Sequence, residues 1–391
     1  MKNKELLLVP GPTPVVDEIY DALASETRGH TDPRFVEIFK NALANTKKLF
    51  NTDGEVYVIA GSGTLAMEMA IVNTVAKGER MLVISHGYFG DRFTPLAKAF
   101  GIEVDVLQAT WGERVDMKLI EEILQKNTYK AVTITHADTS TGVSSDLEEL
   151  VPIIKAAGAL VIVDGVVATA ALQEDMAKVY GNNEMYKIDI VLTGSQKAIG
   201  IPPGLAIVAF SPQALNAREQ MASVPAYYAD IHNWRTIMTN PAMYFATPPV
   251  NLIYAYDKAL EIVLEEGMEK REARHIAFGK AVRDALRSYG MVPLAAETVA
   301  APTLSCILYP EGVEDAIFRA SLASRGVIVA GALAHLAGKA FRIGHMGNTT
   351  AAMLEQAIIA IGEALQEQNQ SVDIDEAVRL FSEQIGQSVR E

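Results

Sequence analysis

The sequence predicts an α/β protein with a seven-stranded, mostly parallel sheet domain and a smaller C-terminal α+β domain. Two observations lead to this prediction. Between positions 56 and 210, short apolar runs alternate with segments of helical character. The composition, with 49% hydrophobic and 21% charged residues, is that of an ordinary globular chain, and 391 residues are enough for two or three domains.

The first 255 of the 391 residues are expected to form an arm, 1–15, and a large domain, 16–255. Prolines in the arm exclude a helix and favour an extended path, and helical spacing covers 35–50. The seven expected strands are Val56–Ala60, Met81–Ser85, Val104–Leu107, Ala131–Thr135, Leu160–Asp164, Ile190–Thr193 and Leu205–Phe210. The connection from Leu192 to Leu205, between the last two strands, leaves little room for a helical crossover. The seventh strand could therefore be antiparallel.

The remaining residues, 256–391, are expected to form the small domain. A long helical stretch runs from Tyr254 towards Tyr289, and an amphipathic tail helix follows Asp373. That tail helix could pack on its own subunit or on a partner. The other expected elements are strands at Leu304–Leu308, Val327–Ala330 and Phe341–Ile343, and helices at Val313–Ser324 and Thr350–Gln366.

Composition narrows the possible partners and location. A net charge of −14 and a pI near 5.1 argue against nucleic acid or an anionic membrane as partner. The single cysteine, Cys306, excludes an internal disulfide framework, and no Cys/His cluster has metal-ligand spacing. No apolar run reaches the length of a membrane span, and no signal peptide is recognisable, so the cytoplasm is the expected location.

Two charged residues follow expected strands. Lys197 comes just after Ile190–Thr193, and Asp164 ends Leu160–Asp164. Ligands of open α/β sheets bind outside the carboxyl ends of the strands. A lysine and an aspartate at that edge suit pyridoxal 5′-phosphate (PLP), because lysine can hold it as a Schiff base and aspartate can pair with its pyridinium nitrogen. A surface lysine and a loop carboxylate are the simpler alternatives.

Weaker signals surround this pair. The turn Gly61–Thr64 joins a strand to a helix and could bind a phosphate, although a tight turn without a ligand is about as plausible. The pattern G-x-G-x-x-G is not completed there, which argues against a nicotinamide enzyme. Phe89 could stack on a ring or belong to the core. Arg342, inside an apolar strand, could bind a substrate carboxylate or form a structural ion pair.

Taken in order, these motifs resemble the class V aminotransferases, which are PLP enzymes of fold type I. The resemblance is to the alanine–glyoxylate, serine–glyoxylate and serine–pyruvate group, and it extends from Pro10-Gly11-Pro12 to the helix after Arg342. It is carried by Gly194-Ser195-Gln196-Lys197-Ala198 with the following Pro202-Pro203-Gly204, by Ser140-Thr141-Gly142-Val143, by Val163-Asp164 and by Arg342-Ile343-Gly344.

The resemblance implies a role for each matching position. Lys197 would hold the cofactor and move a proton, and Asp164 would pair with the pyridinium. Ser62, Gly63, Thr64 and Gln196 would bind the phosphate, Phe89 would stack on the ring where the family usually has tryptophan, and Ser140, or else Thr139, would contact the ring. Arg342 and Gly11 would bind substrate. Tyr244 and Thr247 would reach the phosphate of a neighbouring subunit, so that a homodimer shares its active sites.

The resulting hypothesis is a ping-pong aminotransferase that moves nitrogen from alanine or serine to glyoxylate or pyruvate. An unusual donor such as ureidoglycine and a cysteine desulfurase-like lyase are alternatives, although Cys306 is expected in a strand rather than in a mobile loop. A nicotinamide oxidoreductase or a non-catalytic interaction protein fits less well. Two departures from the family leave the donor open: an expected insertion at Glu174–Tyr186 and the turn Arg28–Thr31, which could line the substrate entrance.

Overall fold

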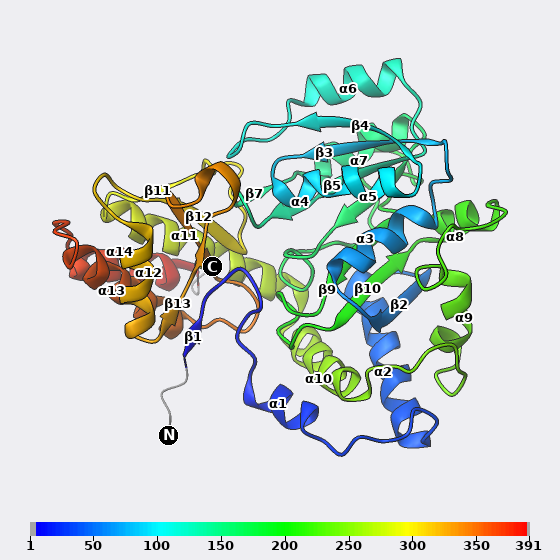
Figure 1. Cartoon of the computed structure of the whole chain (residues 1–391), viewed down its shortest axis with the longest axis horizontal. Coiled ribbons are helices and arrows are strands. Elements are labelled where there is room, and N and C mark those ends of the chain that lie inside the picture. The colour runs from blue at the N-terminus through cyan, green and yellow to red at the C-terminus, as the bar shows by residue number, and fades with distance from the viewer. Residues whose placement is uncertain (1–4, 389–391) are drawn as a thin grey trace.

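A computed structural model describes residues 5–388. A large domain, on the right in Figure 1, is built on a seven-stranded sheet, and a small domain lies beside it. The sheet has the order β2-β10-β9-β8-β5-β3-β4. Its strands are β2 (Glu55–Ala60), β3 (Arg80–Ser85), β4 (Glu103–Gln108), β5 (Ala131–Thr135), β8 (Leu160–Asp164), β9 (Ile190–Gly194) and β10 (Leu205–Phe210).

The predicted direction of the strands is confirmed. β3, β4, β5, β8 and β9 pair in parallel, and β10 runs antiparallel to both β2 and β9. β5, β8, β9 and β10 are buried along their whole length, as expected where helices cover both faces of a sheet. The parallel β5, β8 and β9 therefore end at one edge, where the loops after them meet.

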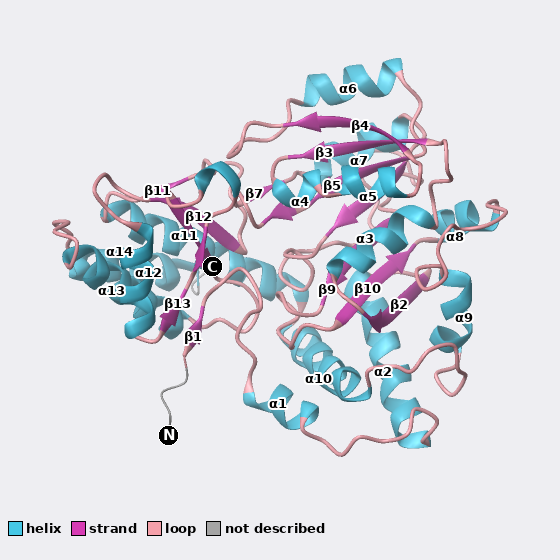
Figure 2. Ribbon diagram, in the orientation of Figure 1, coloured by secondary structure: helices cyan, strands magenta, loops and turns pink. Residues whose placement is uncertain are grey.

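Ten helices of the described chain surround this sheet (Figure 2). They are α1 (Asp17–Leu23), α2 (Pro33–Phe50), α3 (Gly63–Val72), α4 (Tyr88–Asp91), α5 (Phe93–Ala99), α6 (Met117–Lys126), α7 (Leu147–Ala156), α8 (Pro212–Glu219), α9 (Ile231–Thr239) and α10 (Val250–Glu266). A short hairpin, β6 (Ala137–Asp138) with β7 (Val143–Ser144), follows β5 and carries part of the site described below.

The small domain contains a four-stranded antiparallel sheet in the order β11-β12-β15-β14. The strands are β11 (Val292–Pro293), β12 (Leu304–Leu308), β14 (Ala330–Gly331) and β15 (Ala340–Gly344), and the helices are α11 (Met268–Ser288), α12 (Asp315–Ser324), η1 (Ala334–Leu336), α13 (Ala351–Gln366) and α14 (Ile374–Ser388). Separately, β1 (Leu6–Leu7) of the N-terminal arm pairs in parallel with β13 (Val327–Ile328).

The structure changes one expectation about the segment that joins the domains. The long helix expected from Tyr254 towards Tyr289 is divided at Gly267, which has φ +81° and lies between α10 and α11. The buried apolar side chains of α10 belong to the large-domain core, whereas the small-domain core contains Phe278, Ala281, Val282, Ala285 and Leu286 of α11. Gly267 therefore lies between a helix of one core and a helix that contributes to the other.

The tail helix α14 packs on its own subunit. Ala377 and Phe381 are buried in the small-domain core together with side chains of α11 and α13. Within residues 5–388, no helix is both long and apolar enough to cross a membrane.

Candidate active site

A cavity of about 220 Å³ lies at the sheet edge where β8 and β9 end. It brings together segments that are far apart in the sequence. The residues that line it are Ser62, Gly63, Thr64, Met67, Phe89, Arg92, Ala137, Thr139, Asp164, Val166, Val167, Gln196 and Lys197. The predicted meeting of Lys197 and Asp164 at one edge is therefore present.

The Lys197 side chain is directed towards the N-terminal arm. Its Nζ donates a hydrogen bond to the carbonyl oxygen of Pro10. Burial, together with the nearby Arg342 charge, lowers the pKa of Lys197 to about 8, and Asp164 opposes the shift. More of the amine is therefore uncharged near neutral pH than in an ordinary lysine, and the uncharged amine is the form that reacts with a carbonyl group.

The arm is fitted closely around this lysine. Thr13 donates its backbone N–H to the carbonyl of Gln196 over 3.1 Å and its hydroxyl to the carbonyl of Lys197 over 2.7 Å. Gly11 has φ +98°, and a Cβ built there would lie 2.6 Å from Nζ of Lys197. The structure thus places Gly11, a predicted substrate-binding residue, in direct contact with the lysine, where only glycine fits.

Asp164 is a buried carboxylate whose oxygens have no cationic partner within ion-pair distance in the described chain. Its Oδ1 accepts the backbone N–H of Val166 over 3.0 Å. Burial raises the pKa of Asp164 to about 7, with smaller contributions from the carboxylates of Asp138 and Glu174. A protonated ring nitrogen would relieve this cost, because it supplies a charged donor to a carboxylate that burial disfavours.

The turn before α3 fits a phosphate. Ser62 is the N-cap residue, but its side chain makes no capping hydrogen bond, so the first N–H groups of the helix are left for another acceptor. Gln196 lies beside this turn: a Cβ on Gly194 would be 2.9 Å from Oε1 of Gln196 and 3.3 Å from the backbone nitrogen of Gly63. Ser62, Gly63, Thr64 and Gln196 thus form one group.

Phe89 also lines the cavity, and a buried carboxylate that the sequence analysis did not single out holds it there. Oδ2 of Asp138 accepts the backbone N–H groups of Phe89 and Gly90 over 3.0 and 3.1 Å. Its Oδ1 accepts the backbone N–H and the hydroxyl of Ser140 over 2.8 and 2.6 Å. Asp138 therefore joins the loop after β3 to the β6–β7 hairpin.

These contacts decide how the hairpin faces the cavity. Ser140 lies behind the wall, because its hydroxyl is engaged by Asp138 and by the backbone N–H of Tyr88 over 2.9 Å. Thr139, unlike Ser140, lines the cavity. The geometry therefore favours Thr139 over Ser140, the residue preferred from the sequence, for a contact with a bound ring.

Arg342 reaches the same place from the small domain. On β15, its Nε donates to the carbonyl of Gly331 over 2.9 Å and its Nη1 donates to the carbonyl of Thr139 over 3.2 Å. No carboxylate of the described chain forms an ion pair with it, and burial lowers its pKa. Arg342 is thus a half-buried cation without an anion, close enough to Lys197 to affect that residue's pKa.

The expected insertion at Glu174–Tyr186 is tied to the site at its first residue. Glu174 is buried, and its Oε1 lies 2.8 Å from Nδ1 of His136. The backbone N–H of His136 in turn donates to the carbonyl of Asp164 over 3.0 Å. The local sequence pattern indicates no role for Glu174, because its partner His136 lies on a distant segment.

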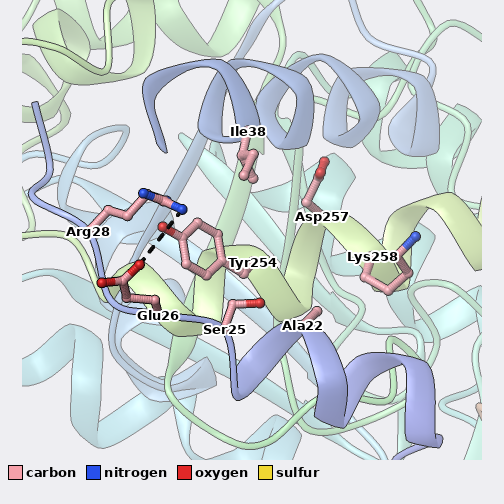
Figure 3. A pocket seen from close by; sticks show the side chains of 8 residues that line it. All are labelled: Ala22, Ser25, Glu26, Arg28, Ile38, Tyr254, Asp257 and Lys258. Atoms are coloured by element: carbon pink, nitrogen blue, oxygen red, sulfur yellow. Dashed lines mark ion pairs between the residues drawn. The ribbon is translucent and has the colours of Figure 1, made fainter. Parts of the chain in front are cut away.

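Three other predicted positions do not reach the cavity within one chain. Tyr244 and Thr247 are exposed on the loop before α10, and the Tyr244 ring lies 5.3 Å from that of His30, centroid to centroid. Arg28 lines a separate hollow of about 300 Å³ between α1, α2 and α10, beside the Tyr254 ring (Figure 3). Within this chain these three residues take no part in the cavity.

The fold and the cavity together define a PLP-dependent transferase: a lysine of lowered pKa, a buried carboxylate and an uncapped helix N-terminus converge at the sheet edge. The sequence profile of the family "Aminotransferase class-V" matches residues 12–340. The chain belongs to this family, and it is a transaminase.

Similar proteins cover nearly the same length. An uncharacterized aminotransferase of Methanocaldococcus jannaschii is 39% identical over 88% of both chains. Alanine–glyoxylate aminotransferase 1 of Saccharomyces cerevisiae is 36% identical, covering 89% of this chain and 93% of its own. A serine–glyoxylate aminotransferase of Methylorubrum extorquens is 33% identical, covering 90% and 89%.

Solved structures have the same fold. Ureidoglycine–glyoxylate aminotransferase of Bacillus subtilis superposes with a TM-score of 0.90 over 99% of both chains at 23% sequence identity. At that identity the likeness concerns the fold alone. Among the relatives whose names state an amino donor, the donors differ. Sequence similarity by itself therefore does not select among donors.

The residues divide the chemical work between them. When bound, PLP supplies a ring that withdraws electrons from the substrate's Cα. Asp164 would hold the ring nitrogen, Phe89 would cover one face of the ring, and the α3 turn would hold the phosphate. Arg342 would bind the substrate carboxylate, and the Lys197 amine, once free, can accept and return a proton.

Replacing Asp164 with Asn should stabilise the cofactor-free protein at high pH. The folded-state pKa of Asp164, about 7, lies above the ordinary 3.8, so the penalty for its ionisation is absent below pH 3.8 and complete above pH 7. At pH 8 we expect Asp164→Asn to gain about 2–4 kcal/mol in the free energy of unfolding. Urea unfolding at several pH values measures this.

Asp53 is exposed, and Asp53→Asn is the control. This substitution should change the free energy of unfolding little at any pH. Equal stability of wild type and Asp164→Asn at pH 8 would contradict the burial argument.

Gly11→Ala should impair loading of PLP, because the new methyl group would overlap the Lys197 side chain. Gly78→Ala is a matched control: Gly78 has φ +83°, but no atom lies within 4 Å of a Cβ placed there. Both variants should carry a similar backbone cost of about 1 kcal/mol. Only Gly11→Ala should bind less cofactor, measured from the absorbance of the bound PLP; equal loading of the two variants would show that the arm can yield.

Proposed function

We propose that this enzyme moves the amino group of alanine or serine to glyoxylate or pyruvate by a ping-pong mechanism. The observation that carries the proposal is Arg342: a half-buried guanidinium without a carboxylate partner, bound to the Thr139 carbonyl and close to Lys197. Such a cation suits the α-carboxylate of both donor and acceptor, because a planar fork matches a carboxylate.

The restricted space near Lys197 supports small substrates. Gly11 leaves no room for even one methyl group beside the lysine. The cavity of about 220 Å³ must receive the cofactor as well as the reacting part of the substrate. A donor with a short side chain fits this space better than one with a long side chain.

The alternative chemistries receive less support. Cys306 is buried on β12 opposite Arg342 of β15, and burial raises the pKa of its thiol to about 12. A desulfurase needs a mobile thiolate, so this cysteine is poorly suited to that role. Ureidoglycine remains an alternative donor, because its carboxylate would meet the same Arg342.

The donor can be tested by absorbance of the purified holoenzyme. Addition of L-alanine or L-serine without an acceptor should convert the spectrum of bound PLP to that of pyridoxamine phosphate, and glyoxylate should reverse the change. Lys197→Ala should abolish turnover, because no other amine of the described chain lines the cavity.

A spectrum that responds to ureidoglycine but to neither amino acid would keep the cofactor chemistry and overturn the proposed donor. Turnover by Lys197→Ala at the wild-type rate would overturn the assignment of the lysine.

We further propose a homodimer with shared active sites, in the cytoplasm. Exposed aromatic and apolar side chains support the dimer: Tyr227, Met243 and Tyr244 are 76%, 48% and 63% exposed in the single chain. A patch of this kind is a common feature of an association surface. Tyr244 and Thr247 on that patch would then serve the partner's cavity.

Mixing two inactive variants tests the shared site. In a mixed dimer of Lys197→Ala with Tyr244→Ala, one site would contain both wild-type residues and the other would contain neither. Random mixing should therefore restore about a quarter of the wild-type sites. No recovery after subunit exchange, with mixed dimers demonstrated by mass spectrometry, would show that Lys197 and Tyr244 serve the same subunit. Wild-type activity of Tyr244→Ala alone would show that Tyr244 is not required.

A further inference from the structure

Arg92 is a second cation at the cavity, and its charge acts to lower the pKa of Asp164 without forming an ion pair with that carboxylate. It follows α4 and lines the cavity on the same side as Phe89. Of the ion pairs formed within residues 5–388, none includes its guanidinium. Asp91, its neighbour in sequence, instead accepts hydrogen bonds from Ser85 and Gln108.

Neutral groups hold the Arg92 side chain. Its Cζ lies 4.8 Å from the centroid of the Phe89 ring and 5.5 Å from that of Tyr88. These aromatic faces attract the cation without neutralising it. The guanidinium is therefore oriented towards the cavity while its charge remains available for an anion.

Within the described chain this guanidinium makes one hydrogen bond, and that bond shows at which end of the cavity Arg92 lies. Nη1 of Arg92 donates to Oγ1 of Thr64 over 3.3 Å. Thr64 belongs to the first turn of α3, where the N–H groups have no side-chain cap. Arg92 and the helix N-terminus thus approach the same point from two directions, and both favour negative charge there.

We propose that Arg92 is a ligand of the PLP phosphate, completing the group formed by Ser62, Gly63, Thr64 and Gln196. The inference rests on the family's dependence on PLP and not on the identity of the amino donor. A phosphate dianion offers several oxygens, and the guanidinium fork can bind two of them while Phe89 still supports its face.

The arrangement also accounts for the different surroundings of the two unpaired arginines. Arg342 is held by backbone carbonyls of Gly331 and Thr139 at the substrate end. Arg92 is held by rings and by Thr64 at the phosphate end. Each carries a positive charge to one anionic group of the bound reactants, so the cavity has two anion-binding ends.

The competing explanation is that Arg92 only positions the Phe89 ring. The two roles can be separated with two cofactor forms: PLP, and 5′-deoxypyridoxal, which lacks the phosphate. A phosphate ligand matters for PLP alone, whereas a support for Phe89 matters for both forms.

The experiment measures equilibrium binding of each form to cofactor-free wild type, Arg92→Gln and Arg92→Lys by absorbance titration. We expect Arg92→Gln to weaken PLP binding by about 10- to 100-fold and 5′-deoxypyridoxal binding by less than about threefold. Arg92→Lys keeps the charge but loses the fork, and should be intermediate for PLP. If Arg92→Gln does not fold, the difference between the two forms in Arg92→Lys decides.

Lys98→Gln is the matched control, because it removes an exposed positive charge from the neighbouring helix α5. It should leave both affinities unchanged. Equal losses for PLP and 5′-deoxypyridoxal in Arg92→Gln would overturn the proposal in favour of the ring-positioning role, and unchanged PLP affinity would overturn it outright. The titration uses neither alanine nor serine. If both amino acids fail as donors, the proposed function is overturned but the proposed role of Arg92 is not affected.

Discussion

The Lys197 amine lies in a place from which solvent is largely excluded, and its hydrogen bond to the Pro10 carbonyl joins the N-terminal arm to the large domain. The same burial that lowers the pKa of Lys197 requires the arm to fit without a gap. Gly11 has a left-handed backbone for this reason, and Thr13 bonds to the carbonyls of Gln196 and Lys197. The reactive amine and the shape of its surroundings thus have one physical origin.

The site also contains charged side chains that form no ion pair within the described chain. Asp164 is a buried carboxylate whose ionisation burial disfavours, and Arg342 and Arg92 are cations without carboxylates among the described residues. Each costs free energy in the empty protein. Ligand groups of opposite charge would recover that cost, so the free energy of binding is in part the relief of a cost already present in the fold.

The sequence was sufficient for features that follow from local pattern. Apolar runs marked the seven strands, and the convergence of parallel strand ends placed Lys197 near Asp164. The sequence was not sufficient where contacts between residues distant in the chain determine which side chain faces the cavity. Whether Ser140 or Thr139 faces the cavity depends on Asp138, which takes the Ser140 hydroxyl, and the role of Glu174 depends on His136.

Two other features do not follow from the sequence pattern, for different reasons. The helical periodicity continues across Gly267, so the pattern alone predicts one helix where the backbone turns between two domains. Tyr244 and Thr247 lie on an exposed loop, and their proposed partner atoms belong to another copy of the chain. A contact of this kind between two copies is not visible in the structure of a single chain.

The path of the arm has a consequence for the order in which the site can assemble. Leu6 and Leu7 pair with Val327 and Ile328, and a few residues later the arm contacts Lys197. Leu6 and Leu7 must therefore wait for a strand made more than three hundred positions later. Contacts so distant in sequence form slowly. The large-domain sheet can form earlier, but the surroundings of the lysine are complete only when the arm has met β13.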